Sequence, residues 1–365
     1  MRTALLIVVL LSGSFVAGAA DLRYPQLPPL PRASKDPANL PTRARRHLGA
    51  ELFFDQRLSG SGRTSCAACH LHTTNWQDNL SNPRPDASQG QDFFLLHDNT
   101  ESLLNIVYRP FLFRDGRHQN QGKAFTEPFT EDNQRLGIDR ADAAVQLAAI
   151  LRAKPGYIAR FQRAFRRDIG NLPANEVMDL TGDAMAAFAT RIVGKTTPFD
   201  RWNRGLGEIP EAAVRGVALF VGTARCLPCH AGPNLTDNQF HNVSTSLPDS
   251  DGRRVLEGRQ HVTHDPGDSG KFLTPSLRQV VTTSPYFASG KAFTLLDVIN
   301  HFDGGASADP NHDPLVGTPL GLTAAEKADL FAFLQTLRAR PTSVRGPTGP
   351  LCDDAAVAAL RAQMP

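Results

Sequence analysis

The pattern of apolar and polar positions predicts a mainly helical chain. Apolar residues recur at helical spacing in five segments, at 43–59, 140–153, 182–194, 210–222 and 324–339. Asp139 is a candidate N-cap for the second segment, and Thr323 with Glu326 forms a capping box before the fifth. Alternating runs typical of strands are scarce, and loops rich in Gly and Pro separate the helical segments. We therefore expect a mainly α fold with long loops.

The first 20 residues have the pattern of a secretory signal peptide. Arg2 precedes an apolar core, and small residues at 17–20 allow cleavage near Ala19 or Ala20. The apolar core is too short for a membrane span, and no other run is apolar enough over a sufficient length. A buried N-terminal helix is the alternative. The pattern predicts an exported protein without a membrane span, most simply a periplasmic one.

Length and loop composition predict two domains after the signal. Removing the signal leaves about 345 residues, which is long for a single hydrophobic core. Residues 24–41 form a Pro-rich, extended entry segment, and residues 196–210 have the composition of a linker. The expected parts are the signal peptide (1–20), an N-terminal domain (21–200), a C-terminal domain (201–340) and a tail (341–365).

The net charge of the chain limits the classes of partner that it is expected to bind. The formal net charge is +3 at pH 7, and 21% of the residues are charged. Domains that bind nucleic acids usually show a stronger basic excess. We therefore expect no nucleic acid partner.

The strongest chemical signal is a Cys-x-x-Cys-His motif that occurs twice. It comprises Cys66, Cys69 and His70 in the first half, and in the second half Cys226, Cys229 and His230. Disulfide chemistry does not require the histidine, a redox dithiol would need a βαβ context, and a zinc ribbon would place its two cysteine pairs roughly 12–20 residues apart. The motif instead indicates covalent attachment of a c-type haem, with the histidine as the proximal ligand of the iron. We therefore expect two covalent haems c, one in each of two cytochrome c-like domains.

Longer segments around both motifs resemble the bacterial dihaem cytochrome c peroxidases and the methylamine-utilisation (MauG) group. The similarity runs in order from Leu48 to Leu337. The segments that carry it are LGAELFFDQRLSGSGRTSCAACH, NTESLLNIVYRPFLFRDGR, TPFDRW, ALFVGTARCLPCHAGPNLTDNQFHNV, GKFLTPSLRQVVTTSPYFASGKAFTLLDVINHFDGG and PLGLTAAEKADLFAFLQTL.

The resemblance implies a role for each haem and a calcium ion between the domains. The N-terminal haem would react with hydrogen peroxide, and the C-terminal haem would relay electrons from a small periplasmic donor, either a cytochrome c or a cupredoxin. The calcium ligands of the family fall on Asn99, Thr283 and Pro285, and calcium accepts backbone carbonyls as well as side-chain oxygens. The alternative is that Asn99 caps a helix and residues 283–285 form a turn.

Four positions depart from the family pattern. The tryptophan that usually lies between the haems falls on Arg114, and the glutamine on the distal side of the first haem falls on Ala124. The distal glutamate, which is the acid–base group of the family, falls on Gln134. The methionine or tyrosine that ligates the second iron falls on Phe302. These substitutions put the catalytic turnover in doubt.

Other residues could carry the acid–base chemistry at the first haem. Gln134 can form a hydrogen bond with peroxide but cannot transfer a proton at neutral pH, and Glu127 and Glu131 lie near it in the sequence. His118 titrates in the useful range, and we take it as the candidate catalytic residue, although a surface histidine is the simpler interpretation. Arg114 could stabilise negative charge or pair with a carboxylate or a haem propionate.

The second iron has no evident sixth ligand. Phe302 cannot coordinate a metal, whereas its neighbour His301 could. Consecutive side chains on a helix diverge by roughly 100°, so His301 would reach the iron only through a distorted turn. We therefore expect the second haem to lack a protein sixth ligand, with His301 as the alternative.

Three functions are compatible with this pattern. The first is a periplasmic dihaem peroxidase. The second is a MauG-like oxidase that modifies a side chain of a partner protein through a high-valent haem, and the third is a dihaem electron-transfer or sensing protein without turnover. Cys352 lies in the tail, outside the segments similar to the family, and is either a free thiol or the bridge of a homodimer.

Overall fold

The computed structural model describes residues 22–31, 39–80, 99–130 and 139–339, apart from positions 195, 249, 251 and 253–255. The predicted signal peptide, the tail with Cys352, and the candidate residues Glu131 and Gln134 lie outside the described residues.

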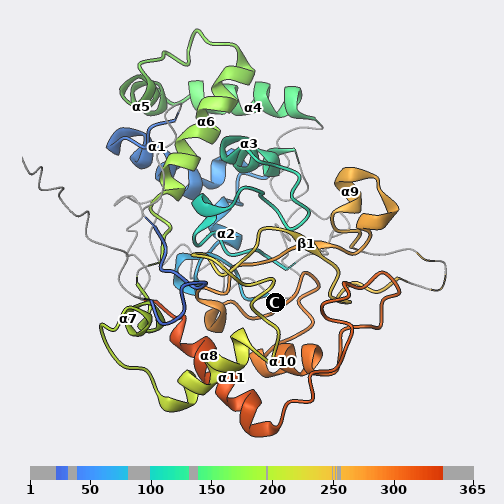
Figure 1. The fold of residues 1–365 in the computed structure, drawn as a ribbon. Coiled ribbons are helices and arrows are strands. Elements are labelled where there is room, and N and C mark those ends of the chain that lie inside the picture. The colour runs from blue at the N-terminus through green and yellow to red at the C-terminus, as the bar shows by residue number, and fades with distance from the viewer. Residues whose placement is uncertain are drawn as a thin grey trace, which may run out of the picture.

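The described chain is mainly helical (Figure 1), which agrees with the apolar pattern. Its α-helices are α1 (Arg43–Phe54), α2 (Cys66–Cys69), α3 (Gln121–Thr126), α4 (Arg140–Arg152), α5 (Pro155–Phe165), α6 (Ala174–Ala189), α7 (Pro198–Asn203), α8 (Glu211–Val221), α9 (Gln260–Thr263), α10 (Leu295–Asp303) and α11 (Ala324–Thr336). Short 3-10 turns are η1 (Gln56–Leu58), η2 (His72–Thr74), η4 (Ile106–Tyr108), η5 (Glu127–Phe129), η6 (Pro266–Asp268) and η7 (Val280–Thr282). Two short strands, β1 (Phe240–His241) and β2 (Phe272–Leu273), pair antiparallel.

All five predicted helical segments are helices in the structure. Asp139 caps α4 by accepting a hydrogen bond from the backbone N–H of Asp142, and Thr323 and Glu326 form the predicted capping box of α11. Helix α6 begins at Ala174, earlier than the apolar pattern indicated. In the part of the chain that the structure describes, no helix is long and apolar enough to cross a membrane.

The buried apolar side chains form two clusters, one in each half of the molecule. The first gathers side chains of α1, α3, α4, α5 and α6, and the second those of α7, α8, α10 and α11. The change from one cluster to the other falls between Ile192 and Phe199, close to the predicted domain boundary at residue 200. Leu27, at the start of the entry segment, is fully buried in the second cluster and not in the first.

The same close helix crossing occurs in both halves. A Cβ atom added to Gly49 of α1 would lie 1.9 Å from the backbone oxygen of Ala184 in α6, and one added to Gly216 of α8 would lie 2.0 Å from that of Asp329 in α11. Glycine is therefore required for the two helix backbones to touch. Because α1 and α8 each precede a Cys-x-x-Cys-His motif in the sequence, the two crossings place these motifs in equivalent settings.

Arg259 joins the two halves. Its guanidinium donates hydrogen bonds to the backbone oxygens of Asp115 and Gly116, and it lies over the ring of Phe240. Phe240 in turn contacts Phe111 edge-on, with ring centroids 5.3 Å apart. Figure 1 shows the strand that carries Phe240 between the upper and lower halves of the molecule.

Candidate functional site

The first Cys-x-x-Cys-His motif forms a single helical turn. Cys66 and Cys69 are the first and last residues of α2, and His70 is its C-cap. His70 Nδ1 lies 3.0 Å from the backbone oxygen of Trp76. A carbonyl oxygen can only accept, so Nδ1 carries the proton and Nε2 keeps its lone pair. Burial lowers the pKa of His70, which favours the neutral form that a metal requires.

The second motif repeats this arrangement. His230 Nδ1 lies 3.0 Å from the backbone oxygen of Leu235, and burial again lowers the pKa of the imidazole. In each half the histidine is therefore fixed in one tautomer by a carbonyl that follows it in the sequence. A hydrogen bond of this kind orients a ligating imidazole and raises its basicity.

The donor set of both motifs fits a covalent haem. The four thiols, Cys66, Cys69, Cys226 and Cys229, are not in disulfides. Burial raises the pKa of Cys69 to about 12, and that of Cys226 to about 12, so these two are held as protonated thiols. Thiols next to a neutral histidine are the set that haem c attachment uses.

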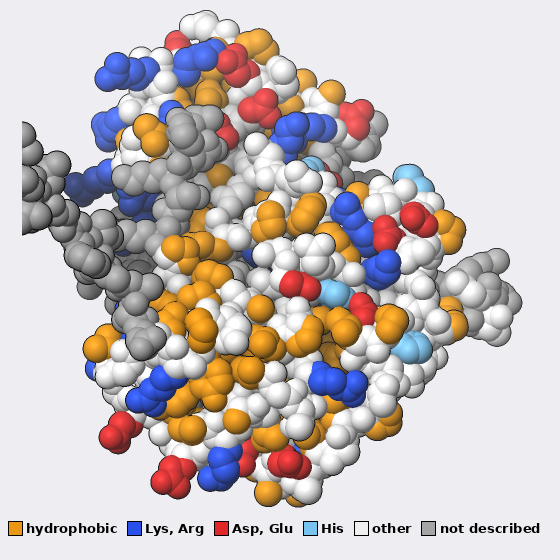
Figure 2. All heavy atoms as spheres, viewed as in Figure 1, with side chains coloured by type: hydrophobic (Ala, Val, Ile, Leu, Met, Phe, Trp, Pro, Cys, Tyr) orange, Lys and Arg blue, Asp and Glu red, His pale blue; other side chains and the backbone are white. Residues whose placement is uncertain are grey.

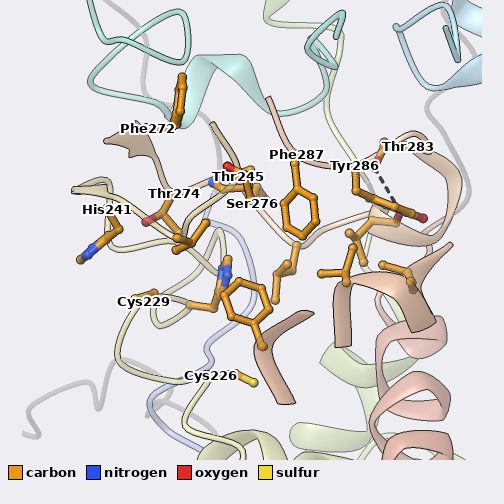
Figure 3. Close-up of a pocket in the computed structure, with 18 of the residues that line it drawn as sticks. Cys226, Cys229, His241, Thr245, Phe272, Thr274, Ser276, Thr283, Tyr286 and Phe287 are labelled. Carbon is orange, nitrogen blue, oxygen red and sulfur yellow. Dashed lines mark hydrogen bonds between the residues drawn. The ribbon is translucent and has the colours of Figure 1, made fainter. Parts of the chain in front are cut away.

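A cavity of about 330 Å³ lies beside the second motif. It reaches from Cys226 and His230 to Asn99 and Arg114 on the other half, and Figure 3 shows Phe287 and Tyr286 on its wall. Its walls are mostly apolar, as is usual for cofactor sites. On the face shown in Figure 2, hydrophobic side chains gather over the half of the molecule that contains α8, α10 and α11.

The structure separates His301 from Phe302. Phe302 lines the cavity beside the second motif. The Nε2 atom of His301 instead lies 2.7 Å from the backbone oxygen of Val243, and its ring packs against Phe287 with centroids 5.0 Å apart. Phe302 therefore lies at the position where the family has an iron ligand. His301, the candidate ligand, instead forms a hydrogen bond with Val243.

The three candidate calcium ligands meet in the same cavity. Asn99, Thr283 and Pro285 all line it, and the Asn99 amide donates to the backbone oxygen of Pro285. The other amide atom, Asn99 Oδ1, is buried and has no hydrogen-bond partner. Since the two ends of an amide are assigned from the surrounding hydrogen bonds, a cation bound by the oxygens of Asn99 and Pro285 would satisfy this buried group.

Arg114 lies between the two halves. Its guanidinium donates to the backbone oxygens of Asn99 at 2.6 Å and Phe287 at 3.2 Å. Glu101 pairs with Arg109 at 3.0 Å and lies 4.0 Å from Arg114 Nε. The structure therefore places Arg114 in a partly buried charged cluster that lines the cavity beside the second motif.

His118 and Glu127 are brought together by the fold. His118 Nε2 lies 3.0 Å from a carboxylate oxygen of Glu127, and Arg117 Nε lies 3.7 Å from the other oxygen. Glu127 follows α3, which carries Ala124, the position of the distal glutamine in the family. The candidate base is therefore held by a carboxylate, which the sequence alone did not pair with it.

Comparison with known proteins identifies the family. A model described as di-haem cytochrome c peroxidase matches residues 43–208. The cytochrome-c peroxidase IdrP1 of Denitromonas iodatirespirans is 33% identical over 88% of this chain and 88% of the relative. The chain belongs to the di-haem cytochrome c peroxidase family. Membership of this family implies haem c cofactors, and it confirms the resemblance found in the sequence.

Other relatives come from both branches of the di-haem peroxidase family. The methylamine utilization protein MauG of Methylorubrum extorquens is 32% identical over 91% of this chain and 87% of the relative. A crystal structure of a MauG-like protein associated with microbial copper homeostasis matches with a TM-score of 0.73 and 27% identity, covering 89% of this chain and 96% of that chain. The diheme peroxidase BthA of Burkholderia thailandensis shares the fold, with a TM-score of 0.68 at 22% identity over 89% of this chain and 97% of that chain.

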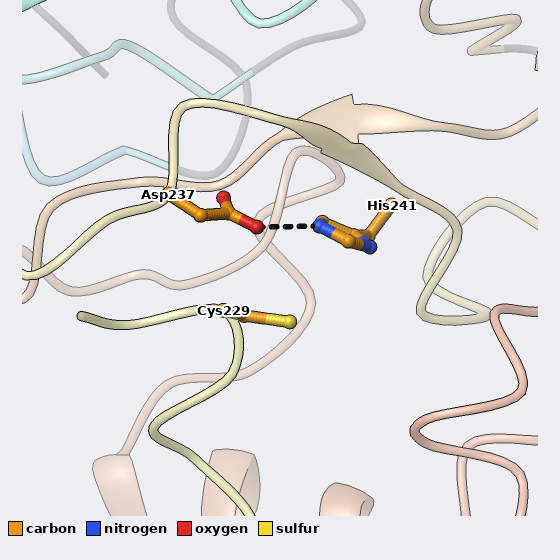
Figure 4. Close-up of side chains that lie close together, drawn as sticks. All are labelled: Cys229, Asp237 and His241. Carbon is orange, nitrogen blue, oxygen red and sulfur yellow. Dashed lines mark hydrogen bonds and ion pairs between the residues drawn. The ribbon is translucent and has the colours of Figure 1, made fainter.

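One cluster of this di-haem peroxidase homologue was not found from the sequence. His241 lies between Asp313, at 2.6 Å from Nδ1, and Asp237, at 2.9 Å from Nε2, and Cys229 is close to it (Figure 4). Three such groups can hold a metal ion, but Cys229 already belongs to the haem motif. The bond from His241 to Asp313 could not be predicted, because the two residues are far apart in the sequence.

Proposed function

We propose that this protein is a periplasmic dihaem c-type oxidoreductase that reduces hydrogen peroxide at its N-terminal haem, with electrons relayed through its C-terminal haem. The observation that carries the proposal is the repeated geometry of the two motifs. In both halves a histidine follows two cysteines that form no disulfide and donates a hydrogen bond from Nδ1 to a backbone carbonyl. When bound, the two haems supply redox-active iron, for peroxide at the first site and for electron transfer at the second.

The chain contributes attachment and orientation at the first site. Cys66 and Cys69 would hold the haem, and His70 would bind its iron through Nε2. Because Nδ1 of His70 donates to the Trp76 carbonyl, the imidazole keeps one tautomer and one orientation. These residues would fix the position of the haem, which would supply redox-active iron for the reaction with peroxide.

His118 would take over the proton transfer that a glutamate performs in the family. Peroxide reduction needs a group that accepts a proton from one oxygen and donates it to the other. Gln134 cannot do this, whereas an imidazole can, and Glu127 holds the His118 ring through a contact of 3.0 Å to Nε2. Gln134 and Glu131 remain candidates to bind peroxide or to donate to it, and Arg114 is proposed to stabilise charge between the haems.

The second site is proposed to hold a haem without a protein sixth ligand, together with calcium nearby. Phe302 lines the cavity and cannot coordinate, and His301 already bonds to Val243. The buried, unpaired oxygen of Asn99 supports a calcium ion bound by Asn99, Thr283 and Pro285. Calcium would bind across both halves of the molecule and so stabilise their contact.

Hydrogen peroxide added to the purified ferric protein tests the proposal. We expect a change in the optical and EPR spectra of the N-terminal haem, and turnover when a reduced cytochrome c or cupredoxin is supplied. The denatured protein should retain its haem stain, and its mass should exceed that of the polypeptide by two haems. One haem or none would overturn the proposal, as would spectra that do not respond to peroxide.

A second candidate is an oxidase that modifies a side chain of a partner protein. The 32% identity to MauG of Methylorubrum extorquens supports it, and so do the replaced distal residues. A mass change in a co-expressed partner, with little turnover of a small donor, would favour this function. A protein that carries both haems but does not react with peroxide would instead be an electron-transfer or sensing protein.

A further inference from the structure

The backbone carbonyl of Trp76, which accepts the hydrogen bond from His70 Nδ1, belongs to a residue with an unusual backbone conformation. Trp76 has a φ of 65°, and the residue before it, Asn75, has a φ of 57°. Left-handed backbone is uncommon outside glycine, and it is unfavourable for a bulky residue such as tryptophan. Such conformations persist where surrounding contacts fix them. The Trp76 side chain is only 2% exposed, so the fold holds this residue firmly.

Two of the contacts that fix this turn come from the other half of the molecule. The Asn75 side chain donates from Nδ2 to the hydroxyl of Thr282 at 2.5 Å. The Gln77 side chain donates from Nε2 to the backbone oxygen of Ser284 at 2.9 Å. The residues on both sides of Trp76 are therefore bound to the loop at 282–284, which belongs to the C-terminal domain.

The N-terminal half supplies further contacts, among them a hydrogen bond from the backbone N–H of Trp76 to the oxygen of Leu71 at 2.7 Å. Ser102 donates from its hydroxyl to the backbone oxygen of Asn75 at 2.5 Å, and the backbone N–H of Leu103 approaches the Trp76 oxygen at 3.3 Å. The Trp76 oxygen thus accepts from both His70 and Leu103. A small rotation of this peptide would shift the carbonyl from one donor towards the other, so the anchors at Asn75 and Gln77 decide how strongly it binds His70.

We propose that Asn75 and Gln77 are positioning residues through which the C-terminal domain sets the basicity of the His70 imidazole, and with it the reduction potential of the N-terminal haem. This inference rests on the proposed haem at Cys66 and Cys69. A stronger hydrogen bond from Nδ1 makes the imidazole a better electron donor and stabilises ferric iron. Loss of an anchor should therefore weaken that bond and make the haem easier to reduce.

The second motif differs in how its carbonyl is held. Leu235, which accepts from His230, is also left-handed, with a φ of 53°. Its neighbours are fixed within the C-terminal domain, because Ser276 donates to the Asn234 oxygen and Thr236 donates to the Thr274 oxygen. Among the described hydrogen bonds, those that hold the carbonyl partner of His70 include two from the C-terminal domain. Those named for the carbonyl partner of His230 all lie within the C-terminal domain.

Substitutions at Thr282 test the proposal from the far side of the interface. Thr282→Val keeps the shape of the side chain but removes the hydroxyl that Asn75 binds. Thr282→Ser keeps this hydroxyl. Asn75→Gly removes the amide and permits the positive φ. We expect Thr282→Val and Asn75→Gly to raise the midpoint potential of the N-terminal haem and to lower the iron–histidine stretching frequency in resonance Raman spectra. Outer-shell partners typically change metal affinity or activity at least tenfold, and a tenfold change in the redox equilibrium corresponds to about 59 mV for one electron.

Arg259→Gln is the matched control, because it weakens the contact between the domains without touching the turn at residues 75–77. The Thr282→Ser and Arg259→Gln proteins should keep the parent potential and Raman frequency. An unchanged potential and frequency in folded Thr282→Val and Asn75→Gly would overturn the inference, and so would an equal shift in Arg259→Gln. A protein whose mass shows no haem at Cys66 and Cys69 would overturn the proposed function itself.

Discussion

His301 donates a hydrogen bond from Nε2 to the backbone oxygen of Val243, over 2.7 Å. A carbonyl accepts only, so this nitrogen carries its proton and is not available to a metal. The neighbouring Phe302 lines the cavity next to His230. The structure therefore directs Phe302, and not His301, into this cavity.

The first prediction concerns this coordination. His301→Ala should leave the EPR spectrum of the second haem unchanged, because the imidazole is bonded to Val243. Phe302→Met should place a thioether in the cavity, convert that haem to a low-spin form and raise its potential. Optical, EPR and redox titrations would show both effects. A low-spin bis-histidine signal that disappears in His301→Ala would contradict this prediction.

The second prediction concerns the pair of His118 and Glu127. His118→Ala should slow the reaction with peroxide by roughly 10²–10⁴-fold, the range for loss of a general base. Glu127→Gln should slow it less, because the imidazole remains and loses only its carboxylate partner. Stopped-flow spectroscopy would measure the rates.

His261→Ala is a suitable control for that experiment, since the His261 side chain is 70% exposed. Its rate should equal that of the parent protein. Gln134→Glu would restore the residue of the family and should raise the rate in the His118→Ala background. Equal rates in the parent protein and in the three single variants would show that His118 has no role in the mechanism.

The third prediction concerns the two helix crossings. Gly49→Ala and Gly216→Ala each place a methyl group about where a backbone oxygen lies. Each should lower the free energy of unfolding by about 1–3 kcal/mol, as overpacking does. Alanine otherwise favours a helix over glycine, so a stabilised variant would mean that the helices are not in contact.

Gly207→Ala provides the comparison for these variants, because the nearest atom to its added Cβ would be 3.7 Å away. Its stability should stay within about 0.5 kcal/mol of the parent protein. Denaturation with guanidinium, followed by far-UV circular dichroism, measures the free energy of unfolding of all three variants.

The fourth prediction concerns the pH dependence of the His241 cluster. Hydrogen bonding to Cys229, and then to Asp313 and Asp237, raises the pKa of His241 to about 10 although burial opposes it. The pKa is thus higher in the folded than in the unfolded chain, where it is about 6.5. The contribution to stability is complete below pH 6.5 and is lost as the pH rises towards 10.

His241→Gln should therefore lower the unfolding free energy most at pH 6, less at pH 8, and not at all above pH 10. Denaturation curves for both proteins at these pH values give the comparison. Attachment of haem turns the Cys229 sulfur into an uncharged thioether, so the contribution of His241 should disappear at a lower pH in the loaded protein. A difference that grows with pH would contradict the assignment of His241 as a cation.

Local patterns in the sequence determined the helices and predicted the two haem attachment motifs. The spacing of apolar residues in segments such as 140–153 depends on neighbours within one or two turns, and the capping box of Thr323 and Glu326 is equally local. The Cys-x-x-Cys-His motif is also local, because its three groups must meet within one turn. Similarity along the whole chain then identified the family, which the comparisons confirmed.

Tertiary structure decided how those local units act on one another. The partners of His118, His241 and His301 are set by chain segments brought together in the fold, and no periodicity in the sequence encodes them. The left-handed turn at Trp76 is unfavourable locally and is held by contacts that include two from the other domain. A sequence pattern records the preferences of neighbouring residues, whereas the orientation of a side chain and the strain of a backbone depend on which distant groups pack against them.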